Sequence, residues 1–307
     1  DRIVLRGDVL DNRQAQACAA RTYTVRLQNT GGKHENADVC TDSACCQAYI
    51  DPQEYLNLGG TEDNLNKIQS AVWDTRGEIL TYAGALIEAT YFSCSGGMTE
   101  DAVAVWGSDI PYLQSVESPG EENASQYTAS VTIPASELLN TLGLHLSGNP
   151  ADWFGTVTYT EGGGVASMHI GNKRFTGTQL RSALGLRSTA FKMQVSGTDI
   201  VITTKGYGHR VGMSQYGAGY MGTKMNQPFY NILRHYYTGI SLGTKPVIVD
   251  QEDVIQKFWN PDGRAQIVIV GQVAPKIILE INGKWFAKIV IVPLATVTFN
   301  KSTSPWK

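Results

Sequence analysis

The order of helix-like and strand-like segments limits the fold of this chain more than any other feature of its sequence. Arg13–Asn29 is rich in Ala, Gln and Arg and is followed by Gly31 and Gly32, which predicts a helix that ends at glycine. From Tyr127 onward, strand-like segments alternate with short helix-like ones, without regular βαβ units. The sequence therefore predicts an α+β fold, in which helices are mixed with antiparallel sheets.

Shorter segments complete this expectation. Further helices are expected at Asn64–Asp74, from Pro134, from Thr176 and at Tyr230–Gly239. Gly77–Gly97 is enriched in Tyr, Thr and Ile and indicates two strands and a turn that lead into a glycine loop. The turn pattern at Gly197 and Thr198 predicts a hairpin over Phe191–Gly206, which leads into a second glycine loop, Gly206–Gly222.

The composition changes after Gly243. The preceding part mixes helix-like and strand-like segments, whereas Thr244–Lys307 consists of strand-like runs such as "PVIVD", "AQIVIVG" and "KWFAKIVIV". We therefore expect one large domain over residues 1–243 and a small β-rich appendage over residues 244–307.

Charge and hydropathy argue against two classes of partner. The net charge is −3 and the Lys and Arg residues are scattered, so the sequence lacks the basic patch that binds nucleic acid. The longest nearly apolar run, Ala287–Phe299, is interrupted by Lys288 and Pro293 and is shorter than the roughly 20 residues that span a bilayer. No membrane span is expected. Because the chain opens with Asp1 and without a signal peptide, we expect that processing or truncation has altered its N-terminus.

The chain has five cysteines, and three of them lie in the short polar segment "VCTDSACCQAY". Ionised Cys40, Cys45 and Cys46 are suitable zinc ligands, and a disulfide such as Cys40 with Cys46 is the alternative. An odd number of cysteines leaves at least one thiol unpaired if the others form disulfides. A thioredoxin-like centre is disfavoured because no Cys-x-x-Cys spacing occurs.

Three motifs carry a resemblance to a known family: "AQACAARTY", "YFSCSGGMTEDAVAVWGSDIPYLQSVESPGEE" and "GYGHRVGMSQYGA". Together they resemble the SpoIID/LytB family of peptidoglycan-processing proteins, over roughly Asp11 to Gly243. The resemblance implies an extracytoplasmic lytic transglycosylase that remodels peptidoglycan at the septum and during engulfment. It would cleave glycan strands after N-acetylmuramic acid and leave a 1,6-anhydro ring. A cell-wall amidase or other sporulation proteins are the implied protein partners.

The resemblance also implies a catalytic glutamate, a short way before the "AQACAARTY" helix. That position falls near Asp1–Leu5, where this chain reads "DRIVL" and has no glutamate. One carboxyl group can act as acid and then as base, so Asp1, Asp8 and Glu88 are the candidates. The alternative is a module without catalytic activity that binds peptidoglycan and stimulates an amidase.

Candidate substrate-binding residues follow from the same motifs. They are Arg21, Tyr23, Ser93, Ser95, Gly96, Gly97, His209, Gln215 and Tyr216. Glycines allow close approach of the backbone to a ligand, and His, Gln and Tyr can hydrogen-bond sugar hydroxyls. Simple packing and an ion pair are the equally open interpretation of Arg21 and Tyr23. Glu100 is expected at a loop or helix start.

Some members of the family carry a Cys followed five residues later by a His, and this pair binds zinc. The corresponding positions here are Cys40 and Cys45, so the resemblance implies a zinc site at these two residues. Cys46, or the distant Cys18 and Cys94, would complete a closed site. A zinc hydrolase is the weaker hypothesis, because the histidines show no spacing such as His-Glu-x-x-His.

Overall fold

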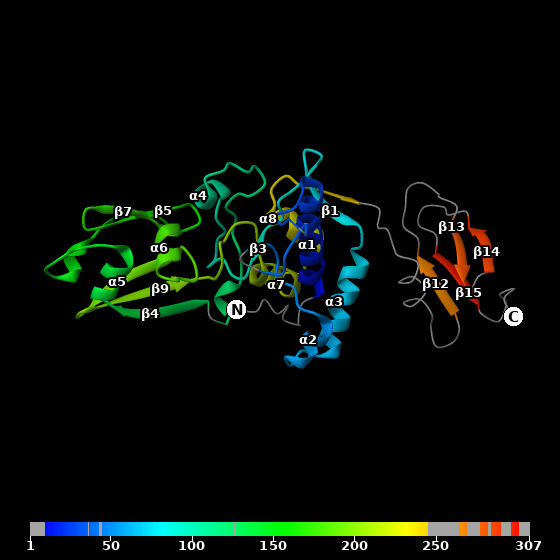
Figure 1. Ribbon diagram of the computed structural model, residues 1–307, viewed down its shortest axis with the longest axis horizontal. Coiled ribbons are helices and arrows are strands. Elements are labelled where there is room, and N and C mark those ends of the chain that lie inside the picture. The colour runs from blue at the N-terminus through cyan, green and yellow to red at the C-terminus, as the bar shows by residue number, and fades with distance from the viewer. Residues whose placement is uncertain are drawn as a thin grey trace. The chain divides into compact units, whose positions relative to one another are not determined.

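The chain forms two compact units, residues Asp1–Gly243 and Thr244–Lys307 (Figure 1). The computed structural model describes residues 10–35, 37–42, 45–125, 127–244, 264–268, 277–281, 284–289 and 296–300. Helices accompany small, mainly antiparallel sheets, and the short strands β3 (Tyr91–Phe92) and β10 (Met213–Ser214) pair in parallel. The predicted α+β class is confirmed.

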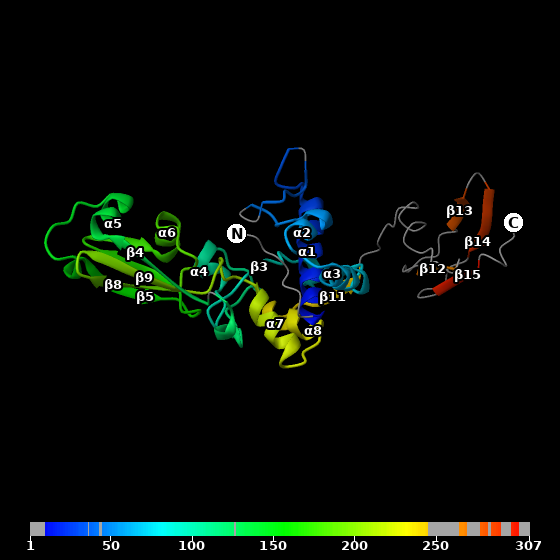
Figure 2. The same ribbon diagram turned by 90° about the horizontal axis from the view of Figure 1, so that it is seen from below.

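The first part of the larger unit is mainly helical. Its helices are α1 (Leu10–Thr30), α2 (Pro52–Asn57), α3 (Glu62–Asp74), α4 (Ala102–Trp106), α7 (Gln215–Thr223) and α8 (Phe229–Tyr236). A small sheet joins β1 (Glu78–Tyr82) to β2 (Ala85–Leu86) and β11 (Ser241–Thr244). Helices α3, α7 and α8 all pack against α1 (Figure 2). Ala15, Cys18 and Ala19 are fully buried on α1, and their small side chains let these neighbours approach closely.

The second part of this unit is built from two three-stranded antiparallel sheets. One has the order β4 (Thr128–Pro134), β9 (Asp199–Lys205), β8 (Phe191–Ser196); the other runs β5 (Phe154–Tyr159), β6 (Val165–Ile170), β7 (Lys173–Thr176). Helices α5 (Ala135–Leu142) and α6 (Gly177–Ala183) accompany them, with short 3-10 turns at Glu121–Asn123 and Pro150–Trp153. Fully buried Leu138, Ile170, Leu180, Ile200 and Ile202 form the centre of this second core.

Local sequence signals explain most of these elements. The side chain of Thr176 accepts a hydrogen bond from the Gln179 N–H, and the Gln179 side chain accepts one from the Thr176 N–H. This capping box satisfies two of the four backbone donors that a helix start leaves open. Pro134 stands directly before α5, and Gly197 has a positive φ of 63° in the turn between β8 and β9. The expected helices and the hairpin are confirmed.

One expectation was wrong: the second half of the glycine segment Gly206–Gly222 is helix α7, not a loop. Ser214 caps this helix by accepting a hydrogen bond from the Gly217 N–H. A Cβ atom on Gly217 would lie 2.0 Å from Ser118 Oγ and 2.2 Å from the Tyr236 hydroxyl. Gly217 is therefore required for close packing between helices, a need that outweighs its low helix propensity.

Two further differences concern short elements. Helix α4, which the sequence did not predict, follows the glycine loop. Its cap is Asp101, whose side chain accepts a hydrogen bond from the Val103 N–H at 2.8 Å. Glu88 was expected on a strand, but it lies in the connection between β2 and β3. The strands on either side of it have only two residues each, too short for an alternation pattern to define their ends.

In the smaller unit the described residues form two antiparallel pairs. Strand β12 (Arg264–Val268) pairs with β15 (Thr296–Asn300), and β13 (Ile277–Ile281) pairs with β14 (Lys284–Ile289). The expected strand "PVIVD" lies outside the described residues.

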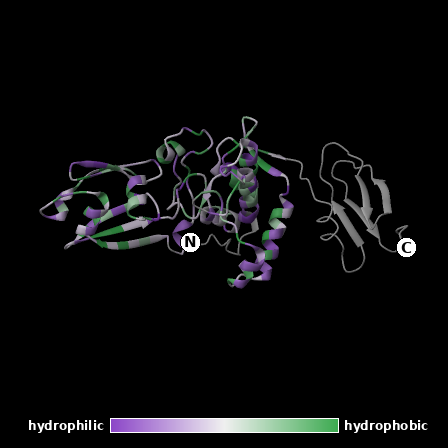
Figure 3. Ribbon diagram, in the orientation of Figure 1, coloured by the Kyte–Doolittle hydropathy of each residue, from purple (hydrophilic) through white to green (hydrophobic). Residues whose placement is uncertain are grey.

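Polar residues interrupt every long helix of the described chain. Both hydrophilic and hydrophobic residues colour α1 and α3 along their lengths (Figure 3). Among the described residues, no helix combines the length and the apolar composition that a bilayer span requires.

Candidate functional site

The first turn of α1 lies against the start of α7. Asn12 donates a hydrogen bond from its side-chain nitrogen to the backbone carbonyl of Gln215, at 3.0 Å. The predicted residue Gln215 thus contributes its backbone at this point. Asp1 and Asp8, the acid candidates in the segment that leads into α1, lie outside the described residues.

The glycine loop after β3 is organised by a buried carboxylate, Glu121, which is 0% exposed. Its Oε2 accepts hydrogen bonds from the Ser95 hydroxyl at 2.6 Å, the Gly96 N–H at 2.7 Å and the Gly97 N–H at 2.9 Å. The Ser95 N–H donates to Oε1 at 3.0 Å. Gly96 and Gly97 have φ values of 91° and 108°, which aim successive N–H groups at one anion.

Glu121 also fastens this loop to the helices. The Ser118 hydroxyl donates to Oε1 at 2.8 Å and contacts the Tyr236 hydroxyl of α8 at 2.7 Å. The hydroxyl of Ser214, the cap of α7, donates to the same carboxylate. Sequence reasoning missed Glu121, because nothing in "SPGEE" distinguishes this buried glutamate from its exposed neighbour Glu122.

The structure brings together the other predicted residues of the two glycine segments. The Ser93 carbonyl accepts a hydrogen bond from the Tyr216 N–H at 3.1 Å, and the Tyr216 hydroxyl lies 3.2 Å from Ser125 Oγ. Cys94, the residue after Ser93, is buried. This burial, together with the charge of Glu121, raises the pKa of the Cys94 thiol to about 12. A thiol that stays protonated is a poor nucleophile.

A buried ion pair, Arg210 with Glu100, joins the two parts of this unit. The guanidinium Nη1 lies 2.7 Å from the Glu100 carboxylate, and Nη2 donates to the carbonyls of Met98 and Gly162. The Gly164 N–H donates to the same Glu100 oxygen at 3.0 Å. Gly162 and Gly164 belong to the turn between β5 and β6, so the pair locks this hairpin onto the glycine segments. Glu100 thus lies directly before the cap of α4, where a loop or helix-start residue was expected, and it also forms the buried ion pair with Arg210.

His209 lies between two aromatic rings. Its ring centroid is 5.4 Å from that of Phe92 and 5.5 Å from that of Trp106. The Val211 N–H donates to His209 Nδ1 at 3.2 Å. Burial, with a smaller effect from the charge of Arg181, lowers the pKa of His209 to about 4. The imidazole is therefore neutral near pH 7 and carries its proton on Nε2, because Nδ1 accepts a hydrogen bond.

Two predicted residues of α1 have partners within the fold. The Arg21 guanidinium donates to the carbonyls of Thr75 at 2.7 Å and Glu78 at 3.0 Å, where α3 ends. It thus satisfies carbonyl groups that a helix end leaves open. The buried Tyr23 accepts a hydrogen bond from the Lys33 ammonium at 3.0 Å. Neither residue belongs to the group around Glu121.

Glu88, the acid candidate within the described residues, has a basic partner. Its carboxylate lies 3.6 Å from the Arg26 guanidinium, and both side chains are about one-third exposed. Its backbone N–H donates to the Tyr112 hydroxyl at 2.9 Å. Glu88 is thus a partly exposed, paired carboxylate in the structure.

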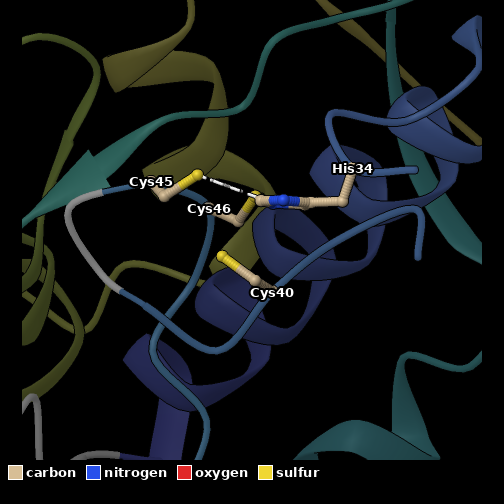
Figure 4. Close-up of side chains that lie close together, drawn as sticks. All are labelled: His34, Cys40, Cys45 and Cys46. Atoms are coloured by element: carbon tan, nitrogen blue, oxygen red, sulfur yellow. Dashed lines mark hydrogen bonds between the residues drawn. The ribbon is translucent and has the colours of Figure 1, made fainter. Parts of the chain in front are cut away.

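The cysteine segment forms a compact group of possible metal ligands. His34, Cys40, Cys45 and Cys46 each offer one ligand atom, and these atoms all lie within 4.8 Å of one another. Their side chains point toward a common centre (Figure 4). Cys45 Sγ is 3.6 Å and Cys46 Sγ is 3.4 Å from His34 Nε2, and the two sulfur atoms are 3.8 Å apart. The four residues form a group that can bind a metal.

The three separations among the ligand atoms of His34, Cys45 and Cys46 fit a tetrahedral zinc ion. Zinc bonds of about 2.3 Å to sulfur and about 2.0–2.1 Å to nitrogen, at tetrahedral angles, place two sulfur ligands about 3.8 Å apart and sulfur and nitrogen about 3.6 Å apart. Hydrogen bonds with Cys40 and Cys46 raise the pKa of Cys45 to about 11. Hydrogen bonding to the Cys40 backbone lowers the pKa of Cys46 to about 7.

The metal group includes both predicted ligands, Cys40 and Cys45, and adds Cys46 and His34. Sequence reasoning missed His34, although it stands only six residues before Cys40 in the same polar segment. Cys18 and Cys94, the distant candidates, are buried elsewhere and are not part of the group. All five cysteines are free thiols in the structure, which therefore contains no disulfide between Cys40 and Cys46.

Two hydrogen bonds attach the cysteine segment to α1. The Lys33 ammonium donates to the Cys45 carbonyl at 2.9 Å while it also donates to the Tyr23 hydroxyl. The Gln47 side chain donates to the Ala20 carbonyl at 3.2 Å. The metal group thus lies beside the middle of α1.

Comparison with known proteins agrees with the three motifs. The family model described as stage II sporulation protein, SpoIID, matches residues 10–82. Over 234 residues the chain is 42% identical to the stage II sporulation protein D of Bacillus amyloliquefaciens and 41% identical to that of Bacillus subtilis (strain 168), which is 75% of this chain and 67% of each relative. An amidase enhancer of Bacillus subtilis (strain 168) is 27% identical over 76% of this chain and 38% of its own length. The chain therefore belongs to the SpoIID/LytB family.

Proposed function

We propose that this protein is an extracytoplasmic lytic transglycosylase that cleaves the glycan strands of peptidoglycan during sporulation. The relatives at 41–42% identity are named for stage II of sporulation, which supports a role in that process. The chemistry requires a carboxylic acid that protonates the glycosidic oxygen as the bond to C1 breaks. The resulting carboxylate then takes the proton from the muramic 6-hydroxyl while that oxygen bonds to C1, so a 1,6-anhydro ring forms and no water is consumed.

The observation that carries this proposal is the contact of Asn12 with Gln215. Family resemblance puts the acid in the segment just before α1, and this contact brings the first turn of α1 to the segment that holds His209, Gln215 and Tyr216. The Tyr216 N–H in turn donates to Ser93, at the edge of the glycine loop. These two contacts thus link the first turn of α1, the start of α7 and the glycine loop, which are far apart in the sequence.

The metal group serves this site indirectly. With His34, Cys40, Cys45 and Cys46 as ligands, a zinc ion has no open position for water or substrate, which is the property of a structural zinc site. The ion would supply cross-linking of the segment between Gly32 and Gln47, whose described residues form no regular helix or strand. A zinc hydrolase would need an open position, so this alternative is the weaker one.

The test is to incubate the protein with glycan strands stripped of their stem peptides and to search for 1,6-anhydro ends by mass spectrometry. Anhydro products support the proposal, and the variants Asp1→Asn, Asp8→Asn and Glu88→Gln then identify the acid. Because Glu88 is already paired with Arg26, we expect Glu88→Gln to retain activity. Intact strands with the wild-type chain would contradict the enzymatic proposal.

A second function is supported by two observations. The chain reads "DRIVL" where the family pattern has its glutamate, and one relative is named amidase enhancer. In this case the protein would bind peptidoglycan without cleaving it and would stimulate a cell-wall amidase. Co-sedimentation with intact glycan strands, together with faster release of stem peptides by an added N-acetylmuramoyl-L-alanine amidase, distinguishes this function from transglycosylation.

A further inference from the structure

Helix α4 holds an exposed tryptophan over the segment that contains His209. The Glu100 N–H donates to the Arg210 carbonyl at 2.6 Å, and the next residue, Asp101, caps the helix. One turn later the Trp106 ring lies 5.5 Å from the His209 ring, at an interplanar angle of 46°. The position of Trp106 is thus fixed from both ends, by the cap and by the ring contact.

Trp106 is exposed in a way that core packing does not explain. Forty per cent of the residue is accessible to solvent. Among the residues that the structure describes, no group accepts a hydrogen bond from its indole N–H. The three residues that follow, Gly107, Ser108 and Asp109, are exposed as well, so a hydroxyl and a carboxylate are available to a ligand in the residues directly after Trp106.

We propose that Trp106 is a stacking platform for one pyranose ring of a glycan strand. The apolar face of an N-acetylated sugar would cover the indole ring, and its hydroxyl or acetamido groups would meet the indole N–H, Ser108 and Asp109. The inference rests on the proposed function and extends it, because it adds a subsite beside His209 that the motif comparison did not indicate.

A sugar fits these surroundings better than a protein partner does. The large apolar side chains exposed on α4 are only Val103 and Trp106, which is far less than the contiguous apolar patch of several hundred Å² that marks protein docking surfaces. The His209 ring that contacts Trp106 also makes an edge-on contact with Phe92, so the platform is held in place before a ligand binds.

The experiment measures binding of N-acetylglucosamine tetramer and of stem-stripped glycan strands to the full chain by calorimetry. Trp106→Ala is compared with Trp106→Phe, which keeps an aromatic face, and with Val103→Ala, which removes a more exposed apolar side chain from the same helix. We expect Trp106→Ala to weaken binding roughly tenfold or more, Trp106→Phe to restore most of it, and Val103→Ala to bind as the wild type does.

Tryptophan fluorescence provides a second measurement that does not depend on the alanine variant being stable. Saturating tetramer should shift the emission of the wild-type chain, and the shift should be absent in Trp106→Phe. Equal affinity of wild type and Trp106→Ala, or an unchanged shift in Trp106→Phe, overturns the subsite and leaves the proposed function intact. Failure of the wild-type chain to bind either glycan overturns both.

Discussion

The Arg210 guanidinium lies 2.7 Å from the Glu100 carboxylate, and the two side chains are only 2% and 1% exposed. Arg210 adopts a φ of 69°, in a region that residues other than glycine seldom occupy. The surrounding contacts hold it there, because its guanidinium also donates to the carbonyls of Ser95, Met98 and Gly162. The hairpin turn between β5 and β6 and the glycine loop are thus fastened to one side chain.

Arg210→Met should therefore destabilise the protein strongly. Removal of one partner leaves the Glu100 charge buried and uncompensated, and such changes cost about 3–5 kcal/mol. Urea denaturation measures the loss in the free energy of unfolding. The control is Lys67→Met, which breaks the exposed pair of Lys67 with Asp63 and should cost less than about 1 kcal/mol. Equal effects of the two variants would contradict the assignment.

Glu121→Gln should also destabilise the protein, although the two side chains have nearly the same shape. An amide offers one acceptor oxygen, and its NH₂ group would face N–H and O–H donors of the glycine loop. Each donor left without an acceptor costs about 1–3 kcal/mol. Glu122→Gln is the matched control, because the neighbouring carboxylate is exposed. Thermal denaturation of both variants checks the prediction, and similar melting temperatures would speak against it.

The neutral state of His209 predicts a pH dependence of stability. The pKa of His209 falls from the ordinary value of 6.5 to about 4 in the folded chain, so the unfolded chain binds the proton at higher pH. The stability that the folded chain has with a neutral His209 is complete above about pH 6.5. It is lost as the pH falls toward about 4, because the unfolded chain then takes up the proton first. His209→Gln does not titrate, so it should lose less stability than the wild type between about pH 7 and pH 5. Parallel losses in denaturant titrations at the two pH values would refute this assignment.

The metal group should bind one zinc ion per chain, measured by elemental analysis. His34→Ala, Cys46→Ser and Cys40→Ser should each reduce the zinc content, since all four side chains offer a ligand atom within the same group. Cobalt substitution provides an independent measurement: the intense visible bands of tetrahedral thiolate coordination should weaken with each lost ligand. Cys18→Ala is the control, because this thiol lies in the core. Full zinc content in His34→Ala would limit the site to the cysteines.

Sequence patterns predicted those parts of the fold in which local chemistry determines the element. The helix that ends at Gly31, the cap at Thr176 and the turn at Gly197 all depend on residues within a few positions. Helix α7 escaped prediction because the need for a small residue at Gly217 comes from Ser118 and Tyr236, which are distant in the sequence.

The same distinction applies to the candidate site. The glycine segments and the cysteines were found from motifs, whereas Glu121 and His34 were not. The local sequence does not reveal Glu121, because the donors that surround its buried carboxylate come from three separate segments around Ser95, Ser118 and Ser214. For His34, only the folded path of the chain brings the imidazole to the thiols.

The attachment of the metal group to the middle of α1 has a consequence for catalysis. The Tyr23 hydroxyl accepts a hydrogen bond from Lys33, which also binds the cysteine segment. Tyr23 is eleven residues beyond Asn12 on a continuous helix. At 1.5 Å per residue, these two positions are separated by about 16 Å along the helix axis. If the proposed transglycosylase chemistry takes place near the first turn of α1, a zinc ion held beside the middle of the helix would act on it as a mechanical support for α1 and not as a Lewis acid.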